Sequence, residues 1–199
     1  MTIIRALLLL GLTATQVVAQ GPQRTIPDGI VREGKLSFDG RATTGNFTGT
    51  TTVLTGKVQG GQLSQVRGWV EAPVRTLTTG NQRRDRDLNK SMESDKYPAI
   101  RFELTDVTGT GGPSDSVNLM LHGRFIIHGV TREATVPASV AFHAEGIRVR
   151  GATPLNLKDY KIGGLSKALG ILKMQKEIMI HVDVLFGPAP TQQAATGSL

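Results

Sequence analysis

Apolar and polar side chains alternate through most of this chain, from about residue 30 to residue 187. Successive side chains of a β-strand point to opposite faces of the sheet, so a two-residue period places each apolar set on one side of a strand. The alternation is clearest in residues 178–186, where every second position is Ile, Val or Phe. The pattern predicts eight strands, near residues 36–47, 53–58, 66–74, 100–105, 117–127, 134–142, 147–149 and 178–186.

The segments between these strands favour antiparallel connections. Residues 59–62 and Glu145-Gly146 are short enough for hairpins, and the connections lack the regular crossover helices of a parallel sheet. Long antiparallel strands with one apolar face form either a two-sheet sandwich or a closed barrel. Closure removes exposed sheet edges, and the long strands favour it. We therefore predict an all-β fold, an extended eight-stranded antiparallel barrel.

Two short helices are expected near the ends of this barrel. The first runs from Asn81 to about Met92, with Leu88 and Met92 on a narrow apolar stripe. The second runs from Gly164 to about Leu172, where Leu and Ala side chains recur at helical spacing.

The N-terminal residues have the layout of a secretory signal peptide. Arg5 precedes an apolar run at 6–12, and Val17-Val18-Ala19 supplies the small residues of a cleavage site. We therefore expect a periplasmic or secreted protein whose mature chain begins near Gln20. This interpretation divides the chain into a signal peptide at 1–19, a lead-in at 20–29, a barrel domain at 30–187 and a disordered tail at 188–199.

The composition excludes several kinds of site. The chain has no Cys, which removes disulfides, thiol catalysis, Cys-zinc sites and iron–sulfur clusters, and its four His are widely separated. No phosphate-binding glycine loop occurs, and residues 164–168 lack the closing Gly of a serine-hydrolase elbow. We therefore expect no catalytic residues, no metal and no cofactor.

The formal net charge of the full chain is +7. A basic surface can attract nucleic acid, anionic lipid or an anionic ligand headgroup. Here the charge is dispersed, and acids offset the one arginine cluster, at 83–87. We therefore expect no nucleic-acid partner.

The predicted inward faces carry mostly small side chains. They are built on Val, Ala and Ile, with Gly68, Gly123 and Gly151 and few aromatics. An eight-stranded barrel is just wide enough to be filled by side chains or to hold one small ligand. Small lining residues favour the second outcome, so we predict an apolar pocket inside the barrel rather than a water channel.

Trp69 departs from the alternation, because its position falls on the polar face between Arg67 and Glu71. We expect a helix to pack over this ring. An uncovered Trp69 would instead indicate a contact surface. The sequence leaves the oligomeric state open, a homodimer included.

Three motifs carry a resemblance to a known family. The first runs from Thr-Thr-Gly-Asn at 78–81 through Arg84-Asp85 to Tyr-Pro-Ala-Ile-Arg-Phe at 97–102. The second, residues 125–132, is an apolar strand that continues into His-Gly-Val-Thr-Arg, and a weaker third is Leu-Lys-Asp-Tyr-Lys-Ile at 157–162. Together they resemble the YceI-like family of exported polyisoprenoid-binding proteins, over about residues 30–187. The compressed first strand pair, 38–49, departs from the family pattern.

The resemblance implies a lipocalin-like barrel that encloses a long isoprenoid, such as a quinone tail or a polyprenyl lipid. Its partner would be this isoprenoid or another long-chain apolar lipid, and a carrier of this kind would touch a membrane surface transiently. Arg84 would meet a polar or anionic headgroup, or else pair with neighbouring Asp residues. The candidate ligand-binding residues are Phe38, Val70, Arg84, Phe102, Leu104, Phe125, Ile127, Phe142 and Ile180.

Two alternatives to a lipid carrier remain at this point. A lipocalin-like barrel enzyme acting on an apolar substrate would need a buried polar constellation, such as a cluster of Arg, Asp and His. No acid–base pair falls on the predicted inner faces. A secreted interaction domain would have a barrel filled solidly by its own side chains.

Overall fold

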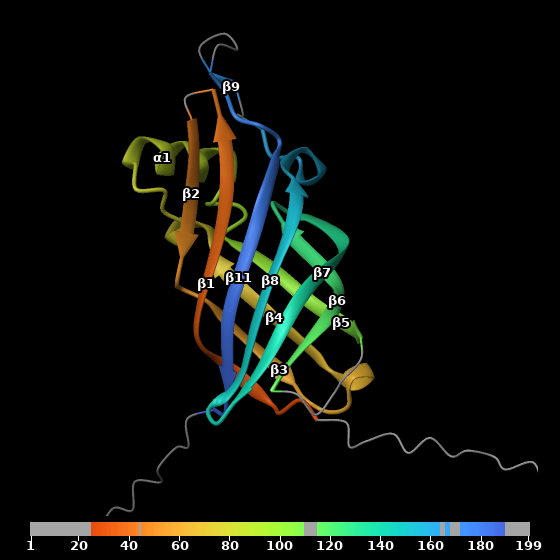
Figure 1. Ribbon diagram of the computed structural model, residues 1–199. Coiled ribbons are helices and arrows are strands. Elements are labelled where there is room, and N and C mark those ends of the chain that lie inside the picture. Colours follow the sequence, from red (N-terminus) through yellow and green to blue (C-terminus); the bar gives the residue numbers. More distant parts are fainter. Residues whose placement is uncertain (1–24, 44, 110–114, 164–165, 168–171, 190–199) are drawn as a thin grey trace, which may run out of the picture.

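A computed structural model describes residues 25–43, 45–109, 115–163, 166–167 and 172–189 (Figure 1). This part of the chain forms one large antiparallel sheet, one α-helix and three short 3-10 turns. The strands of the large sheet are β1 (Gly29–Ala42), β2 (Gly45–Thr51), β3 (Thr55–Gln59), β4 (Arg67–Pro73), β5 (Ala99–Thr108), β6 (Ser116–Ile127), β7 (Val130–His143), β8 (Gly146–Asn156) and β11 (Glu177–Gly187). The remaining elements are η1 (Leu63–Gln65), η2 (Val74–Thr76), α1 (Gln82–Ser91), η3 (Leu157–Tyr160), β9 (Ser166–Lys167) and β10 (Leu172–Lys173).

Eight of the strands close into a barrel. The sheet order is β11-β8-β7-β6-β5-β4-β3-β1, and β11 pairs with β1 to complete the ring. Each neighbouring pair in the ring is antiparallel, as the hairpin connections predict. The predicted eight-stranded antiparallel barrel is therefore confirmed, and β2 is an additional strand.

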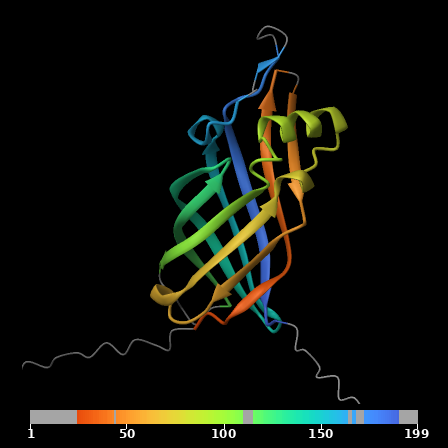
Figure 2. The same cartoon turned by 180° about the vertical axis from the view of Figure 1, so that it is seen from behind.

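The strand β2 lies on the same edge of β1 as β3 does. β3 pairs with Gly29 and Ile30 at the lower end of β1, whereas β2 pairs with Leu36–Ala42 at its upper end. In the described part of the chain no strand ladder continues from the outer edge of β2. The helix α1 lies there instead, beside the upper part of β2 in both views (Figures 1 and 2).

The core is divided between the two ends of the barrel. The lower core, at the end where β7 turns into β8, consists of buried Ile26, Val58, Val66, Val107, Val117, Leu119, Val140, Ile147, Val184 and Phe186. The upper core consists of Val74, Met92, Ile127, Leu155, Leu157, Tyr160 and Ile162. Along β11 the inward side chains pass from half-buried at Ile178 and Ile180 to buried at Val184 and Phe186. The upper half of the barrel is therefore less completely filled than the lower half.

The first predicted strand, 36–47, is wrong as a single element. The chain reverses after Ala42, and β1 and β2 form a hairpin in which Ala42 pairs with Gly45. Gly45 has φ 118°, a left-handed conformation that favours glycine. The apolar alternation resumes after this turn, so the pattern alone does not distinguish these two strands from one long strand.

The second predicted helix, from Gly164 to about Leu172, is also wrong in its described part. Residues 164–165 and 168–171 lie outside the described residues, but β9 and β10 pair antiparallel, with Leu172 opposite Lys167. The predicted segment contains Gly164 and Gly170. Each glycine costs about 1 kcal/mol in a helix relative to Ala, which weakens the case for a helix here.

The first predicted helix is confirmed as α1. Asn81 begins it as the N-cap, because its Oδ1 accepts a hydrogen bond of 3.1 Å from the backbone N–H of Arg84. Neither α1 nor any other described helical segment is long and apolar enough to cross a membrane.

Candidate apolar binding cavity

Two cavities lie along the inside of the barrel. The upper cavity has a volume of about 390 Å³, and the lower cavity one of about 140 Å³. The first volume falls within the range of small-molecule binding sites, roughly 300–1,000 Å³. The upper cavity is lined by Leu36, Ser37, Phe38, Ala42, Thr43, Phe47, Leu77, Asn81, Arg83, Arg84, Asp87, Leu88, Ser91, Met92, Ile100, Phe125, Ile127, Leu155, Leu157, Ile162, Met174, Ile178 and Ile180.

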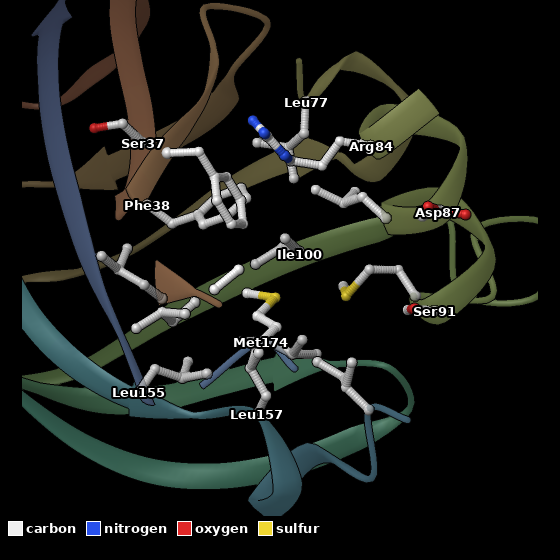
Figure 3. Close-up of a pocket in the computed structure, with 18 of the residues that line it drawn as sticks. Ser37, Phe38, Leu77, Arg84, Asp87, Ser91, Ile100, Leu155, Leu157 and Met174 are labelled. Atoms are coloured by element: carbon white, nitrogen blue, oxygen red, sulfur yellow. The ribbon is translucent and has the colours of Figure 1, made fainter. Parts of the chain in front are cut away.

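The walls of the upper cavity come from several elements far apart in the sequence. Figure 3 shows Phe38 of β1 opposite the side chains of α1, with Ile100 of β5 and Leu157 of η3 on the remaining sides. The exposed lining residues are Thr43, Asn81 and Arg83. The mouth of the cavity therefore lies between the β1–β2 turn and the first turn of α1.

Aromatic rings and glycines pair reciprocally across the β1–β2 hairpin. Phe38 is opposite Gly49, and Gly40 is opposite Phe47. A Cβ added to Gly49 would meet the ring of Phe38, and one added to Gly40 would meet the ring of Phe47. The two rings are in edge contact, with centroids 6.1 Å apart. Each glycine thus provides the space in which an aromatic ring of the cavity wall lies.

Arg84 links α1 to this aromatic wall. Its guanidinium lies 4.2 Å from the centroid of the Phe47 ring, within the range of a cation–π interaction. Figure 3 shows the side chain extending from α1 toward Phe38. The described charged residues that line the upper cavity are Arg83, Arg84 and Asp87, so positive charge exceeds negative charge at its mouth.

The start of α1 is held by Asp85. Its Oδ1 accepts hydrogen bonds from the backbone N–H of Thr79 at 2.8 Å and from the Thr79 hydroxyl at 2.6 Å. Its Oδ2 accepts one from the Thr78 hydroxyl at 3.1 Å. Burial opposes ionisation of this carboxyl, but the hydrogen bonds from Thr79 and Thr78 and the charge of Arg84 lower its pKa overall. The Thr-Thr-Gly-Asn…Arg-Asp motif therefore fixes α1 at the cavity mouth.

A buried histidine joins three segments behind the cavity wall. The Nδ1–H of His128 donates to the backbone carbonyl of Tyr160 at 2.9 Å, and its Nε2 lies 3.2 Å from a carboxylate oxygen of Glu93. The His128 ring also contacts Tyr97, with centroids 4.6 Å apart. Glu93 and His128 both have positive φ, 45° and 52°. The cavity-lining residues Met92 and Ile127 immediately precede these two, so the histidine connects pieces of the wall that come from different elements.

The lower cavity is almost entirely apolar. It is lined by Ile26, Leu36, Leu54, Lys57, Val58, Leu63, Val66, Gly68, Trp69, Val70, Ala72, Ile100, Phe102, Leu104, Val107, Leu119, Leu121, Phe125, Val136, Val140, Ile147, Val149, Gly151, Ala152, Thr153, Ile180, Val182, Val184 and Phe186. Leu36, Ile100, Phe125 and Ile180 line both cavities. These four residues therefore lie where the two spaces adjoin.

Ion pairs tie neighbouring strands together outside the cavities. Asp183 of β11 accepts hydrogen bonds from Arg148 at 2.6 Å and from Arg150 at 2.9 Å, both from β8. Burial opposes ionisation of Asp183, but these two arginines lower its pKa overall. In the described part of the chain, no three His, Asp or Glu side chains are grouped closely enough to hold a metal ion.

The structure places eight of the nine predicted site residues in the walls of the two cavities. Phe38, Arg84 and Ile127 line the upper cavity, whereas Val70, Phe102 and Leu104 line the lower one. Phe125 and Ile180 line both. Phe142 lines neither and packs against the lower core.

Several wall residues have no counterpart in the sequence prediction. These residues are Leu155 at the end of β8, Leu157 of η3, Ile162 just after η3, and Met174 between β10 and β11. Phe47 also reaches the upper cavity, from a hairpin that the alternation does not reveal. The Leu88 and Met92 stripe was the available signal for α1, and both residues do line the cavity.

Trp69 is covered by Arg101, whose guanidinium lies 4.2 Å from the ring centroid. Arg101 also forms ion pairs with Glu103 at 2.9 Å and Glu71 at 3.3 Å. The observed partner of the ring is therefore a side chain of the adjacent strand β5 and not the expected helix.

Comparison with known proteins gives one family and several similar structures. A family model described as a YceI-like domain matches residues 31–186. No curated protein matches the chain in sequence.

The similar structures share the fold at low sequence identity. A polyisoprenoid binding domain from Saccharophagus degradans, implicated in plant cell wall breakdown, has TM-score 0.67 and 13% identity, covering 82% of this chain and 99% of that one. BcnA from Burkholderia cenocepacia has TM-score 0.63 and 16% identity, covering 76% and 94%. A YceI protein from Campylobacter jejuni has TM-score 0.57 and 16% identity, covering 71% and 85%.

Proposed function

Because this chain belongs to the YceI-like family, we propose that its barrel binds a long isoprenoid lipid, a quinone tail or a polyprenyl chain, in the upper cavity. The observation that carries this proposal is an apolar cavity of about 390 Å³ inside a closed barrel. Support also comes from the Saccharophagus degradans domain of the same fold, which is described as polyisoprenoid-binding.

The driving force is the removal of apolar surface from water. A chain with roughly 300 Å² of apolar surface gains about 7.5 kcal/mol at about 25 cal/mol per Å², before the cost of ordering it is subtracted. The walls that receive it include Phe38, Ile127 and Ile180. Their positions on fixed strands limit the ordering cost on the side of the protein.

The cavity mouth favours a polar or anionic headgroup. Arg83 and Arg84 outweigh Asp87 there, and Arg83 is exposed to solvent. Arg84 keeps its guanidinium against Phe47, where it faces the space that a headgroup would occupy. A lipid bound with its chain inward would therefore place the chain against apolar walls and its headgroup beside the arginines of α1.

The same arrangement supports binding rather than catalysis. The charged groups that line the described cavity lie on α1 at its mouth, and the deeper walls are aliphatic and aromatic. Acid–base catalysis needs titratable groups positioned beside the reacting atoms.

We further propose that the protein acts outside the cytoplasm, on the basis of the signal-like sequence at 1–19. Expression of the full chain in a bacterium, followed by fractionation and N-terminal sequencing, tests this. The expected product starts near Gln20 in the exported fraction, and a cytoplasmic product that starts at Met1 would contradict it.

Native mass spectrometry of the purified protein, combined with organic extraction, tests lipid binding. We expect a prenyl lipid to be extracted, or added farnesol to be taken up. Ile178→Trp places a large ring in the upper cavity and should abolish this uptake. Met179→Trp is the matched control, because Met179 is the next residue on β11 and is exposed. A consistently empty wild-type barrel that takes up no farnesol would overturn the proposal.

A further inference from the structure

The two cavities adjoin at side chains from opposite walls of the barrel. Leu36 and Ile180 come from the paired strands β1 and β11, and Ile100 and Phe125 come from the paired strands β5 and β6. In the ring of eight strands these two pairs lie across from each other. The four residues, called here the partition, border both the upper space, which opens at α1, and the smaller lower space.

Phe125 packs against a second ring, that of Phe102, which lines the lower cavity. Phe102, opposite it on β5, lies with its centroid 4.9 Å from that of Phe125. Phe102 in turn occupies the space above Gly123, where an added Cβ would lie 2.7 Å from its Cζ atom. Displacement of Phe125 toward the lower cavity would therefore have to move a second packed ring.

The volume of each cavity gives an estimate of how many carbon atoms of a hydrocarbon chain it can hold. A dry apolar cavity of about 150 Å³ accommodates benzene, which corresponds to roughly 25 Å³ per carbon atom. On this scale the upper cavity, about 390 Å³, holds about 15 carbon atoms, or three isoprene units. The lower cavity, about 140 Å³, holds about one unit more.

We infer that the partition acts as a chain-length stop, so that the protein selects an isoprenoid whose buried part is about three units long. This inference rests on the proposed function and concerns its specificity. A longer chain leaves its additional units at the mouth beside α1, where they remain in contact with water. Removal of the partition joins the two spaces and lets a fourth unit enter.

The test compares three prenyl alcohols, geraniol, farnesol and geranylgeraniol, which have two, three and four isoprene units. Their affinities for the purified protein are measured by competition in native mass spectrometry. The wild-type protein should bind farnesol more tightly than geraniol and gain little from farnesol to geranylgeraniol. Phe125→Leu should bind geranylgeraniol about tenfold more tightly than farnesol, because one more unit becomes buried.

Phe142→Leu is the matched control, since it makes the same change at a phenylalanine that lines neither cavity. It should leave the order of the three affinities unchanged. Ile180→Ala opens the partition from the opposite wall and should shift the preference in the same direction as Phe125→Leu. Thermal unfolding identifies any variant that does not fold. Because the two opening variants change residues on opposite walls, one can test the inference if the other does not fold.

The outcomes separate the two proposals. The chain-length stop is overturned if wild-type protein already binds geranylgeraniol about tenfold more tightly than farnesol. It is also overturned if the folded opening variants keep the wild-type order. If none of the three alcohols binds to the wild-type protein, the proposed function itself fails and the stop fails with it.

Discussion

Four glycines on the strands of this barrel lie close to neighbouring groups. Gly49 lies under the ring of Phe38, and Gly123 lies under that of Phe102. Gly68 is close to the carbonyl of Lys57, and Gly151 to a methyl group of Val136. The sequence correctly indicates an apolar pocket. The argument from small glycine side chains locates only the lower cavity, which Gly68 and Gly151 line, and not the larger upper one. The upper cavity lies where β2 and α1 form part of the wall, and the apolar alternation does not indicate this position.

The contact between Gly49 and Phe38 gives a prediction for one residue. In Gly49→Ala the new methyl group overlaps the Phe38 ring, which must move into the upper cavity. Overpacking of this kind costs about 1–3 kcal/mol. Urea denaturation should therefore show a lower free energy of unfolding. Gly163→Ala is the control, because no atom lies within 4 Å of its added Cβ. Equal stability of the two variants would show that Phe38 does not depend on this glycine.

Among the elements, α1 was predictable from its ends and its apolar stripe. Asn81 is a favourable N-cap, and Leu88 and Met92 lie one turn apart on the face that reaches the cavity. The strands of the ring were predictable because a buried face imposes a strict two-residue period. The β1–β2 hairpin was not predictable in this way. The chain reverses direction at its turn, but the apolar alternation continues on the other side of it.

The anchor of α1 makes stability depend on pH. Asp85 has a lowered pKa in the folded protein, so its contribution is fully present above about 3.8, its ordinary value, and is lost as pH falls through the lowered one. Asp85→Asn weakens the hydrogen bonds from Thr79 and should cost about 1 kcal/mol at neutral pH. Denaturation curves should show this difference at pH 5–7 and its decline below about pH 3.8.

The exposed Asp95 supplies a control for that measurement. It pairs with Arg75 at the surface, where an ion pair contributes little. Asp95→Asn should change the free energy of unfolding less than Asp85→Asn at pH 5–7. A difference between wild type and Asp85→Asn that stays constant down to pH 2 would contradict the role assigned to the carboxylate.

The barrel as a whole is more completely filled at its lower end, which has a cavity of about 140 Å³, than at its upper end, which has one of about 390 Å³. Ile147, in the lower core, is 3% exposed, whereas Ile178 of β11 is only half-buried and lines the upper cavity. Both belong to the inward alternation that the sequence reveals, so the pattern identifies them as equivalent. Their difference arises from how the strands, α1 and η3 meet in three dimensions. For the same reason the division into two cavities could not be predicted.

This asymmetry predicts unequal costs for the same substitution. Ile147→Ala should lower the free energy of unfolding by about 2–5 kcal/mol, because Ile147 is buried in the lower core and its loss enlarges the small lower cavity. Ile178→Ala should cost less, because its side chain is only half-buried and borders the larger upper cavity. Chemical denaturation of both variants measures the difference. Equal losses would indicate that the upper half is as solid as the lower one, which would favour an interaction domain over a carrier.

The position of α1 beside the outer edge of β2 affects how material can exchange with solvent. The ring of eight strands closes without either element, since β3 and β11 both pair directly with β1. A molecule that moves past α1 displaces a helix and a few side chains, but it breaks none of the main-chain hydrogen bonds that close the ring. Exchange of a bound lipid past α1 would therefore leave the ring intact, so the rate of exchange and the rate of unfolding would depend on different parts of the chain.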